Sequence, residues 1–355
     1  MGPGVVRWGM AVSCRIEFRR YRLPFRAPVR TAHGRWAERE GVLVRVERPD
    51  GSMGFGEAAP IPGFAGGGVD EIEAALRRIG GACAPEVMEA LPATLNSLRA
   101  ALRSAFHDEP LSPEAAVPAY LGVAALLPAG RAVLTDLPAK CEAGFRVFKW
   151  KVGVGDIADE LALLDDVCAA LPVGARLRLD ANGAWDRRRA ERWLERCAER
   201  PIEHVEQPCL AAPDAGDTDR RRVDDLLLGL AGDFPTAIAL DESLAGDADL
   251  SRWLGMGWPG VFVVKPALLA DAATSLAELR KRKVPVVFSS ALETAIGARL
   301  ALRTAFRWGG EARALGFGVW PLFADARFDG PRSAPFVRRE DVEAIEAEAA
   351  WNALN

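Results

Sequence analysis

Short apolar runs alternate with helical stretches from about residue 112 onward, and this alternation limits the possible folds more than any other feature of the sequence. Six runs have the length and composition of buried strands: 145–152, 176–180, 202–206, 236–241, 261–265 and 284–289. The stretches between them include three expected helices, at 157–171, 187–199 and 272–282. Repeated strand–helix units predict a parallel α/β architecture, most simply a TIM-type barrel. An open, doubly wound sheet is the alternative, but no Gly-x-Gly-x-x-Gly turn follows an early strand.

The segment before the barrel predicts a small α+β unit. An alternating strand at 41–47 is followed by the turn sequence Pro-Asp-Gly and a returning strand at 52–57, and two helices come after it. The stretch 58–68 is rich in Gly and Pro, so we expect a mobile loop there. At the other end of the chain, 340–354 predicts one amphipathic helix that packs back on this unit.

Charge and cysteine content limit the class of protein. The chain has 45 basic and 49 acidic residues, a formal net charge of −4, and this balance argues against a surface for nucleic acid or an anionic membrane. The longest uncharged run, 115–130, is broken by two prolines, and Arg7 and Arg15 interrupt the region where a secretory signal needs an apolar core. The six cysteines show no zinc-type spacing and are expected to be reduced. We therefore expect a cytoplasmic protein without a membrane span that acts on a small molecule.

Lysine is rare in this chain, and its placement is informative. Only six of the 45 basic residues are Lys, so 45 − 6 = 39 are Arg. Yet Lys149, Lys151 and Lys265 lie in apolar strands. Arg cannot release a proton near neutral pH, whereas Lys can when its surroundings lower its pKa. The three lysines therefore indicate proton-transfer chemistry.

Five consecutive strands end in polar residues, and in a barrel the carboxyl ends of the strands form the active face. Along the chain these residues are Lys149 with Lys151, then Asp180, Glu206, Asp241 and finally Lys265. Two lysines two positions apart share one face of a strand. Three carboxylates that converge on one point are hard oxygen ligands suited to Mg²⁺, and without a cation they would repel one another. The sequence thus predicts a magnesium site with a lysine on either side.

The chemistry suited to this arrangement is removal of a proton next to a carboxylate that the metal binds. A lysine with a pKa of about 10.4 is neutral only about 0.04% of the time at pH 7, and a second lysine, a divalent cation and burial all lower that pKa. This gives Lys149 a role as the neighbour of Lys151. Plainer interpretations exist, since one strand-end carboxylate can cap a helix and one lysine can extend into solvent, but all five strand ends match a single mechanism. For His204, we expect a hydrogen-bonded interior side chain rather than a catalytic one.

The complete set of strand ends resembles the enolase superfamily, in its muconate-cycloisomerase-like branch, and in particular the o-succinylbenzoate synthases. The motifs that carry this resemblance span nearly the whole chain: GEAAPIPGF at 56–64, KWK at 149–151, RLDAN at 178–182, VEQPC at 205–209, LDES at 240–243, KP at 265–266 and SSALE at 289–293. The resemblance implies an α/β fold with a TIM-type (β/α)₇β barrel under an α+β capping domain. The expected division is 1–111 for the cap, 112–322 for the barrel and 323–355 for a C-terminal segment that returns to the cap.

The resemblance also implies a role for each matching residue. Asp180, Glu206 and Asp241 match the Mg²⁺ ligands, with Mn²⁺ as an alternative ion. Lys151 matches the general base that takes the α-proton of 2-succinyl-6-hydroxy-2,4-cyclohexadiene-1-carboxylate, and its protonated form then helps to expel the hydroxyl group from the same side. Lys265 matches the opposite lysine, which is expected to stay charged and face the ring as a cation–π partner. Supporting roles fall to Lys149 and Asn182, and substrate binding to Ser289, Ser290 and Glu293. The product would be 2-succinylbenzoate, on the route to menaquinone or phylloquinone.

Two alternative functions stand beside this one. N-succinylamino acid racemization, or another epimerase or cycloisomerase reaction of the superfamily, would use the same lysines alternately as acid and base. Dipeptide epimerases need carboxylates on the last strand, where this chain has LGFGVWP at 315–321 without an acid. A non-catalytic binding homologue would be expected to lack a lysine or a carboxylate, and none is missing. Oligomeric state, the quinone concerned, accompanying racemase activity and catalytic efficiency all stay open.

Overall fold

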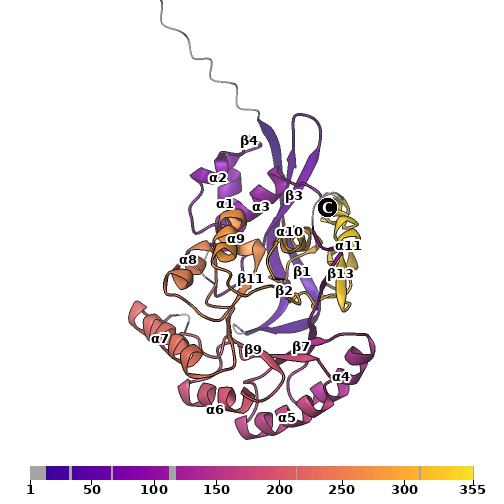
Figure 1. The fold of residues 1–355 in the computed structure, drawn as a ribbon. Coiled ribbons are helices and arrows are strands. Elements are labelled where there is room, and N and C mark those ends of the chain that lie inside the picture. Colours follow the sequence, from indigo (N-terminus) through magenta and orange to yellow (C-terminus); the bar gives the residue numbers. More distant parts are fainter. Residues whose placement is uncertain are drawn as a thin grey trace, which may run out of the picture.

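The structure is a computed structural model, and it describes residues 13–31, 34–64, 67–111, 117–212, 214–311 and 313–354. The chain folds into a capping unit that lies over one end of a barrel (Figure 1). The long strands of the cap run down toward the barrel, and the C-terminal helices lie beside these strands (Figure 1). The α/β fold with a cap over a TIM-type barrel is confirmed. The residue bounds of the three expected segments stay predictions.

The cap is built on a four-stranded antiparallel sheet in the order β3-β2-β1-β4. Its strands are β1 Cys14–Thr31, β2 Gly34–Glu47, β3 Met53–Ala58 and β4 Ala82–Cys83. Apolar and arginine side chains alternate along the middle of β1, so that Tyr21 and Leu23 are buried while Arg20 and Arg22 are exposed. This alternation gives the sheet one buried face.

Three helices complete the cap: α1 Val69–Ile79, α2 Val87–Ala90 and α3 Asn96–Phe106. Helix α3 packs directly on β3, and two glycines allow it to do so. A Cβ atom added at Gly54 or Gly56 would lie 1.9 Å from a backbone carbonyl oxygen of α3. Larger residues at these two positions would therefore push α3 away from the sheet.

The barrel consists of seven parallel strands closed by an eighth short segment. The sheet order is β12-β11-β10-β9-β8-β7-β6, so that each strand lies beside its neighbour in sequence. The strands are β6 Ala125–Leu127, β7 Val147–Lys151, β8 Arg176–Asp180, β9 Ile202–Glu206, β10 Ile238–Leu240, β11 Val261–Val264 and β12 Val286–Phe288. Parallel bridges join Gly316 to Ser289 and Leu315 to Val123, and these bridges close the sheet between β12 and β6. The (β/α)₇β arrangement is thus confirmed.

Helices cover the outside of the barrel (Figure 1). They are α4 Ala132–Glu142, α5 Ile157–Ala170, α6 Arg187–Cys197, α7 Asp217–Asp233, α8 Asp247–Gly255, α9 Ala272–Lys281 and α10 Ala295–Phe306, with a 3₁₀ turn at Pro266–Leu268. Phe148 and Trp150 of β7 are fully buried, and Trp150 meets Trp193 of α6 edge-on at 6.4 Å. Lys149 and Lys151 therefore face the inside of the barrel, because side chains alternate along a strand.

The C-terminal segment does not form the single helix expected at 340–354. It contains a 3₁₀ turn Ala326–Phe328, strand β13 Phe336–Arg338, which pairs with β5 Tyr120–Gly122, and two short helices, α11 Arg339–Glu343 and α12 Ala347–Asn352. The break between the helices lets Val342 and Trp351 both be buried. Trp351 lies 6.3 Å from the Phe55 ring of the cap, under the Arg19 guanidinium. The prediction of one helix was wrong because Val342 and Trp351 would point in opposite directions on one continuous helix, whereas here both lie in the same core.

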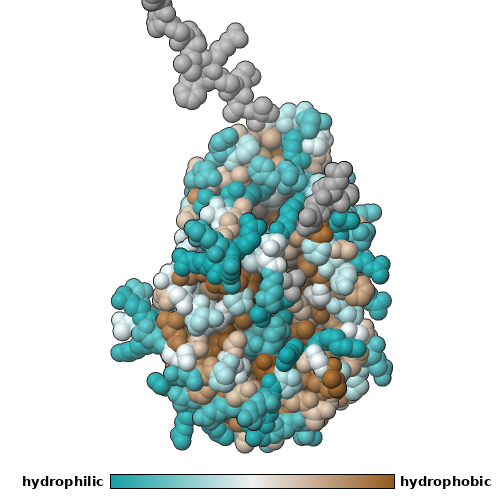
Figure 2. Space-filling view, in the orientation of Figure 1, coloured by the Kyte–Doolittle hydropathy of each residue, from teal (hydrophilic) through white to brown (hydrophobic). Residues whose placement is uncertain are grey.

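Polar side chains cover most of the face shown in Figure 2, with apolar groups scattered between them. No helix in the described part of the chain is both long and apolar enough to cross a membrane. All six cysteines are free thiols, as expected.

Candidate active site

A cavity of about 250 Å³ lies between the cap and the carboxyl ends of the barrel strands. The cap contributes Val29, Trp36, Ile61 and Phe64 to its wall. The barrel contributes the rest: Leu126, Leu127, Lys149, Lys151, Asp180, Asn182, Asp241, Glu242, Lys265, Ser289, Ser290, Ala291, Leu292, Gly316 and Val319. One wall is therefore apolar, and the floor carries lysines and carboxylates. Such a cavity suits a small, partly apolar acid.

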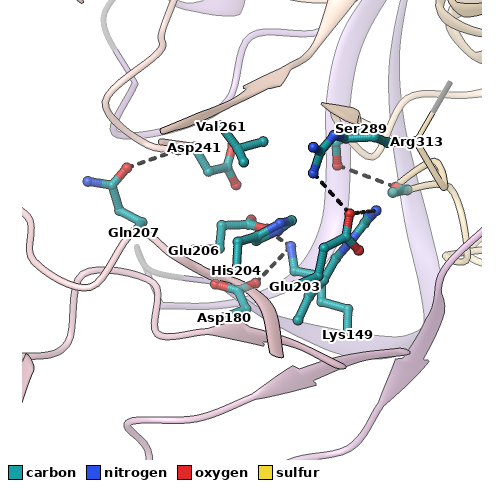
Figure 3. Close-up of polar contacts among 12 residues, drawn as sticks. Lys149, Asp180, Glu203, His204, Glu206, Gln207, Asp241, Val261, Ser289 and Arg313 are labelled. Atoms are coloured by element: carbon teal, nitrogen blue, oxygen red, sulfur yellow. Dashed lines mark hydrogen bonds and ion pairs between the residues drawn. The ribbon is translucent and has the colours of Figure 1, made fainter. Parts of the chain in front are cut away.

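Strand register brings the lysine pair and the first two carboxylates together. Lys151 pairs with Asp180 across β7 and β8, and Asp180 pairs with Glu206 across β8 and β9. The Lys149 ammonium lies 2.9 Å from Asp180 Oδ2 and 2.6 Å from Glu206 Oε1 (Figure 3). One cation therefore bridges the two carboxylates.

The third carboxylate is paired with the opposite lysine. Asp241 follows β10 and forms an ion pair with Lys265, which follows β11. The Lys265 Nζ atom also lies 5.4 Å from the centre of the Phe64 ring, which comes from the cap. An ammonium group at this distance attracts the face of an aromatic ring. The position of Lys265 thus suits contact with a cyclic, unsaturated ligand.

Burial and charge shift the pKa values of these groups in different directions. Burial opposes the charge of Lys149, but the Asp180 and Glu206 carboxylates outweigh it and raise its pKa above the ordinary 10.5. Burial lowers the pKa of Lys265 to about 8. For Glu206, burial raises the pKa, and the Lys149 charge opposes the shift. Burial, followed by the Asp180 charge, raises the pKa of Glu242 to about 7. The two carboxylates therefore stabilise the protonated form of Lys149.

The donor chemistry at these strand ends fits Mg²⁺, although the carboxylates are not arranged around one point. In the described ranges, no three His, Cys, Asp or Glu side chains form a group that could hold a metal ion. The Lys149 ammonium lies between Asp180 and Glu206, and Asp241 is paired with Lys265 instead. Asp180, Glu206 and Asp241 are all buried, and buried carboxylate oxygens are hard ligands that need a positive partner. These three residues could hold Mg²⁺ once their side chains turn from the lysines.

Asn182 and Gln207 form hydrogen bonds that hold the ends of the strands, and only Asn182 was predicted to support the site. Asn182, predicted as a supporting residue, donates to Glu242 Oε1 at 2.9 Å, and its backbone N–H donates to Asp180 Oδ1 at 3.1 Å. Gln207 was missed. Its fully buried side chain accepts from the backbone N–H of Asp241 at 3.0 Å (Figure 3) and from that of Ser243 at 3.1 Å. Its place directly after a predicted ligand in the sequence was the available signal.

The serine loop, residues 289–293, closes the far side of the cavity. Ser289 and Ser290, which are predicted to bind the substrate, line the cavity. Glu293 does not. It is fully buried behind the serines, where it accepts from the Ser290 hydroxyl at 2.9 Å and from the Ala291 N–H. Burial raises the pKa of Glu293 to about 7. The structure therefore places Glu293 where it supports Ser290 rather than where it would touch a ligand.

His204 lies beneath the site, where sequence reasoning expected a hydrogen-bonded side chain. It is fully buried, but neither ring nitrogen has a hydrogen-bond partner among the described residues, and Nε2 is 4.0 Å from Glu206 Oε2. Burial and then the Arg178 charge hold its pKa well below 6.5. Arg178 in turn donates to Glu203 at 2.8 Å. His204 is thus a neutral interior group, and the expected hydrogen bond was wrong.

Two family models match this chain, and known proteins resemble it along most of its length. Residues 14–94 match the MenC N-terminal domain, and residues 134–306 match the enolase C-terminal domain-like family. The o-succinylbenzoate synthase of Thermosynechococcus vestitus is 39% identical over 328 residues, 91% of this chain and 95% of that protein. The o-succinylbenzoate synthase of Yersinia pseudotuberculosis serotype I is 26% identical over 313 residues, 79% and 84% of the two chains.

Solved structures agree with this result. The crystal structure of o-succinylbenzoate synthase from Thermosynechococcus elongatus, with Mg in its active site, has a TM-score of 0.77 at 36% identity and covers 96% of this chain and 99% of that one. The L-Ala-D/L-Glu epimerase of Bacillus subtilis has a TM-score of 0.77 at 22% identity, covering 91% and 95%, and shows a shared fold alone. Fold and site together define an enolase-like enzyme. Within that class, the chain belongs to the o-succinylbenzoate synthase family. The expected family is confirmed.

Proposed function

We propose that this enzyme eliminates water from 2-succinyl-6-hydroxy-2,4-cyclohexadiene-1-carboxylate to give 2-succinylbenzoate. The observation that carries the proposal is the 39% identity to a curated o-succinylbenzoate synthase across 91% of this chain. The site supports it with lysines on two sides of a cavity whose remaining wall is apolar. A ring that bears one carboxylate matches that division between a charged floor and an apolar wall.

Lys151 is the residue we assign to the proton transfers. In the reaction, the C1–H and C6–O bonds break, a C1–C6 double bond forms, and the hydroxyl group leaves as water with the proton taken from C1. One group on one face of the ring can perform both transfers. Lys149 lies two positions before Lys151 on the same face of β7, so it supplies a positive charge beside Lys151. Lys265 faces the ring from the other side and stabilises the negative charge that develops there.

Asp180, Glu206 and Asp241 are the residues that would hold Mg²⁺. When bound, the ion would neutralise a substrate carboxylate and make the neighbouring proton more acidic. Asn182 and Gln207 hold the strand ends on which these carboxylates stand. We also propose that the enzyme works in the cytoplasm, on the route to menaquinone or phylloquinone. The free cysteines support the cytoplasmic location, because thiols stay reduced in the cytoplasm.

The test is an ultraviolet assay of the dehydration with purified enzyme and Mg²⁺, with and without a chelator. We expect turnover that the chelator abolishes. Lys151→Arg should eliminate turnover although it keeps the charge, because Arg does not give up its proton. Lys149→Arg should reduce turnover less, since a positive charge beside Lys151 is kept. Turnover by Lys151→Arg above that of Lys149→Arg would mean that the base has been misassigned.

Racemization of N-succinylamino acids is the second candidate. The observation that favours it is that Lys151 and Lys265 line the same cavity, so that each could exchange a proton on its own face of a planar intermediate. A wild-type enzyme that racemizes these compounds rapidly but shows no dehydration would replace the first proposal with this one.

A further inference from the structure

Arg39 of strand β2 is a buried cation without a buried anion beside it. Its side chain is 2% exposed, and no carboxylate among the described residues forms an ion pair with it. A guanidinium group carries five N–H donors in a fixed plane and stays charged in proteins. Burial of such a charge is unfavourable unless all of its donors find acceptors. The partners of Arg39 are therefore informative.

All five donors of Arg39 meet backbone carbonyl oxygens. The acceptors come from three segments: Glu40 on β2 at 3.2 Å, Ala59 and Pro60 (2.7 Å) after β3, and Ala291 and Leu292, each at 3.2 Å, in the serine loop. The last two lie more than 250 residues away in the sequence. One side chain thus joins the cap to the barrel.

Both segments joined by Arg39 form walls of the cavity. Ile61 and Phe64 follow the two carbonyls on the cap side, and Ser290 and Leu292 belong to the barrel side. Leu292 has a φ angle of 59°, in the left-handed region that residues with side chains seldom adopt. Such a conformation persists only where its surroundings fix it, and here Arg39 holds the Leu292 carbonyl while the Ser290 hydroxyl accepts from the Leu292 N–H at 2.9 Å.

We propose that Arg39 is a positioning residue for substrate recognition, which fixes the cap segment 59–64 and the serine loop against each other and so sets the shape of the cavity. It does not touch the predicted metal ligands, which stand on other strands. The proposal rests on the proposed function only for the identity of the ligand, 2-succinylbenzoate.

Arg39→Lys is the test variant, because Lys has three donors and leaves at least two of the five carbonyls without a partner. Arg45→Lys is the matched control. Arg45 stands on the same strand and is partly buried, but it pairs with Glu17 and packs on Trp351, away from the cavity. Hydrogen exchange should become at least about tenfold faster in segments 59–64 and 289–293 of Arg39→Lys and stay unchanged there in Arg45→Lys.

Calorimetric titrations provide the functional measurement. The Kd of 2-succinylbenzoate should rise about tenfold in Arg39→Lys, whereas the Kd of Mg²⁺ should stay within about twofold of the wild-type value. Unchanged exchange at 289–293, or equal effects of the control variant, would overturn the positioning role. Failure of 2-succinylbenzoate to bind the wild type would instead count against the proposed function, and the exchange measurement would still decide the role of Arg39.

The wild-type chain offers a measurement that does not depend on the folding of a variant. Because one guanidinium group holds both segments, their amides should open together, with the same dependence of exchange on urea concentration. Different urea dependences for 59–64 and 289–293 would show that the two walls open independently, and this result would refute the proposal.

Discussion

Glu57 is the cap residue whose replacement should most clearly weaken the contact between cap and barrel. Its carboxylate is 1% exposed at the end of β3 and accepts from the Tyr21 hydroxyl at 2.5 Å. It also accepts from three groups at the start of α10: the Thr294 N–H at 3.0 Å, the Thr294 hydroxyl and the Gly297 N–H at 2.9 Å. A buried anion of the cap therefore satisfies the amino end of a barrel helix, directly after the serine loop.

The size of the effect follows from these contacts. Glu57→Gln keeps the shape but places an NH₂ group among donors, so one or two of the four interactions are lost. A hydrogen bond to a charged group contributes about 1.5–3 kcal/mol, and an anion at a helix N-terminus about 0.3–1 kcal/mol. The Tyr21 and Thr294 hydroxyl groups can turn to accept from the new NH₂ group, which offsets part of the loss. We expect the free energy of unfolding to fall by about 2–4 kcal/mol.

Urea denaturation at neutral pH measures this change, and Glu17→Gln is the control. Glu17 is a cap carboxylate in ion pairs with Arg15 and Arg45, 32% exposed, so its replacement should cost less than about 1 kcal/mol. A double-mutant cycle with Thr294→Val should give a coupling energy of at least about 1 kcal/mol. A loss for Glu57→Gln no larger than that of the control, or a coupling near zero, would refute the reasoning.

Three further variants test the site. Asp241→Asn should weaken Mg²⁺ binding at least about tenfold, measured by calorimetry, and nearly abolish turnover while the circular dichroism spectrum stays unchanged. Lys265→Arg should keep some dehydration, because a guanidinium group can also lie over a ring; for N-succinylamino acids it should block α-deuterium exchange from one enantiomer only. Exchange from both enantiomers would show that Lys265 moves no proton there. Glu293→Gln tests a pH effect, because the pKa of Glu293 rises from 4.5 in the unfolded chain to about 7 in the folded one. The protonated carboxyl group therefore stabilises the folded state. This stabilisation is fully present below about pH 4.5 and is lost as the pH rises through about 7. From pH 4.5 to pH 8, the free energy of unfolding of the variant should therefore increase by up to about 3 kcal/mol relative to that of the wild type, as measured by urea denaturation. A difference between variant and wild type that is the same at both pH values would contradict the raised pKa.

The barrel and its floor could be predicted from the sequence because both depend on local patterns. Strands 176–180 and 202–206 were predicted at the bounds that the structure shows, and each ends in a carboxylate. The two lysines of β7 face the barrel interior because side chains alternate on a strand, whatever lies around them. Consecutive parallel strands then bring successive strand ends side by side, so neighbours in sequence order become neighbours in space.

The contacts that hold the cap on the barrel could not be predicted in this way, because no local sequence pattern marks the residues that form them. Arg39 stands in the charged run Glu38–Glu40, which has the appearance of an exposed strand end, and its Leu292 partner is 253 residues away. Glu57 carried more signal, since it is the only charged residue among the small and apolar residues 53–59. A charge in such a stretch must find a partner, but the sequence does not say where. Only closure of the cap onto the barrel shows that Arg39 holds the loop that carries Ser289 and Ser290, and that Glu57 holds the start of α10 directly after it. A substitution in this loop should therefore act on cap stability as well as on ligand affinity.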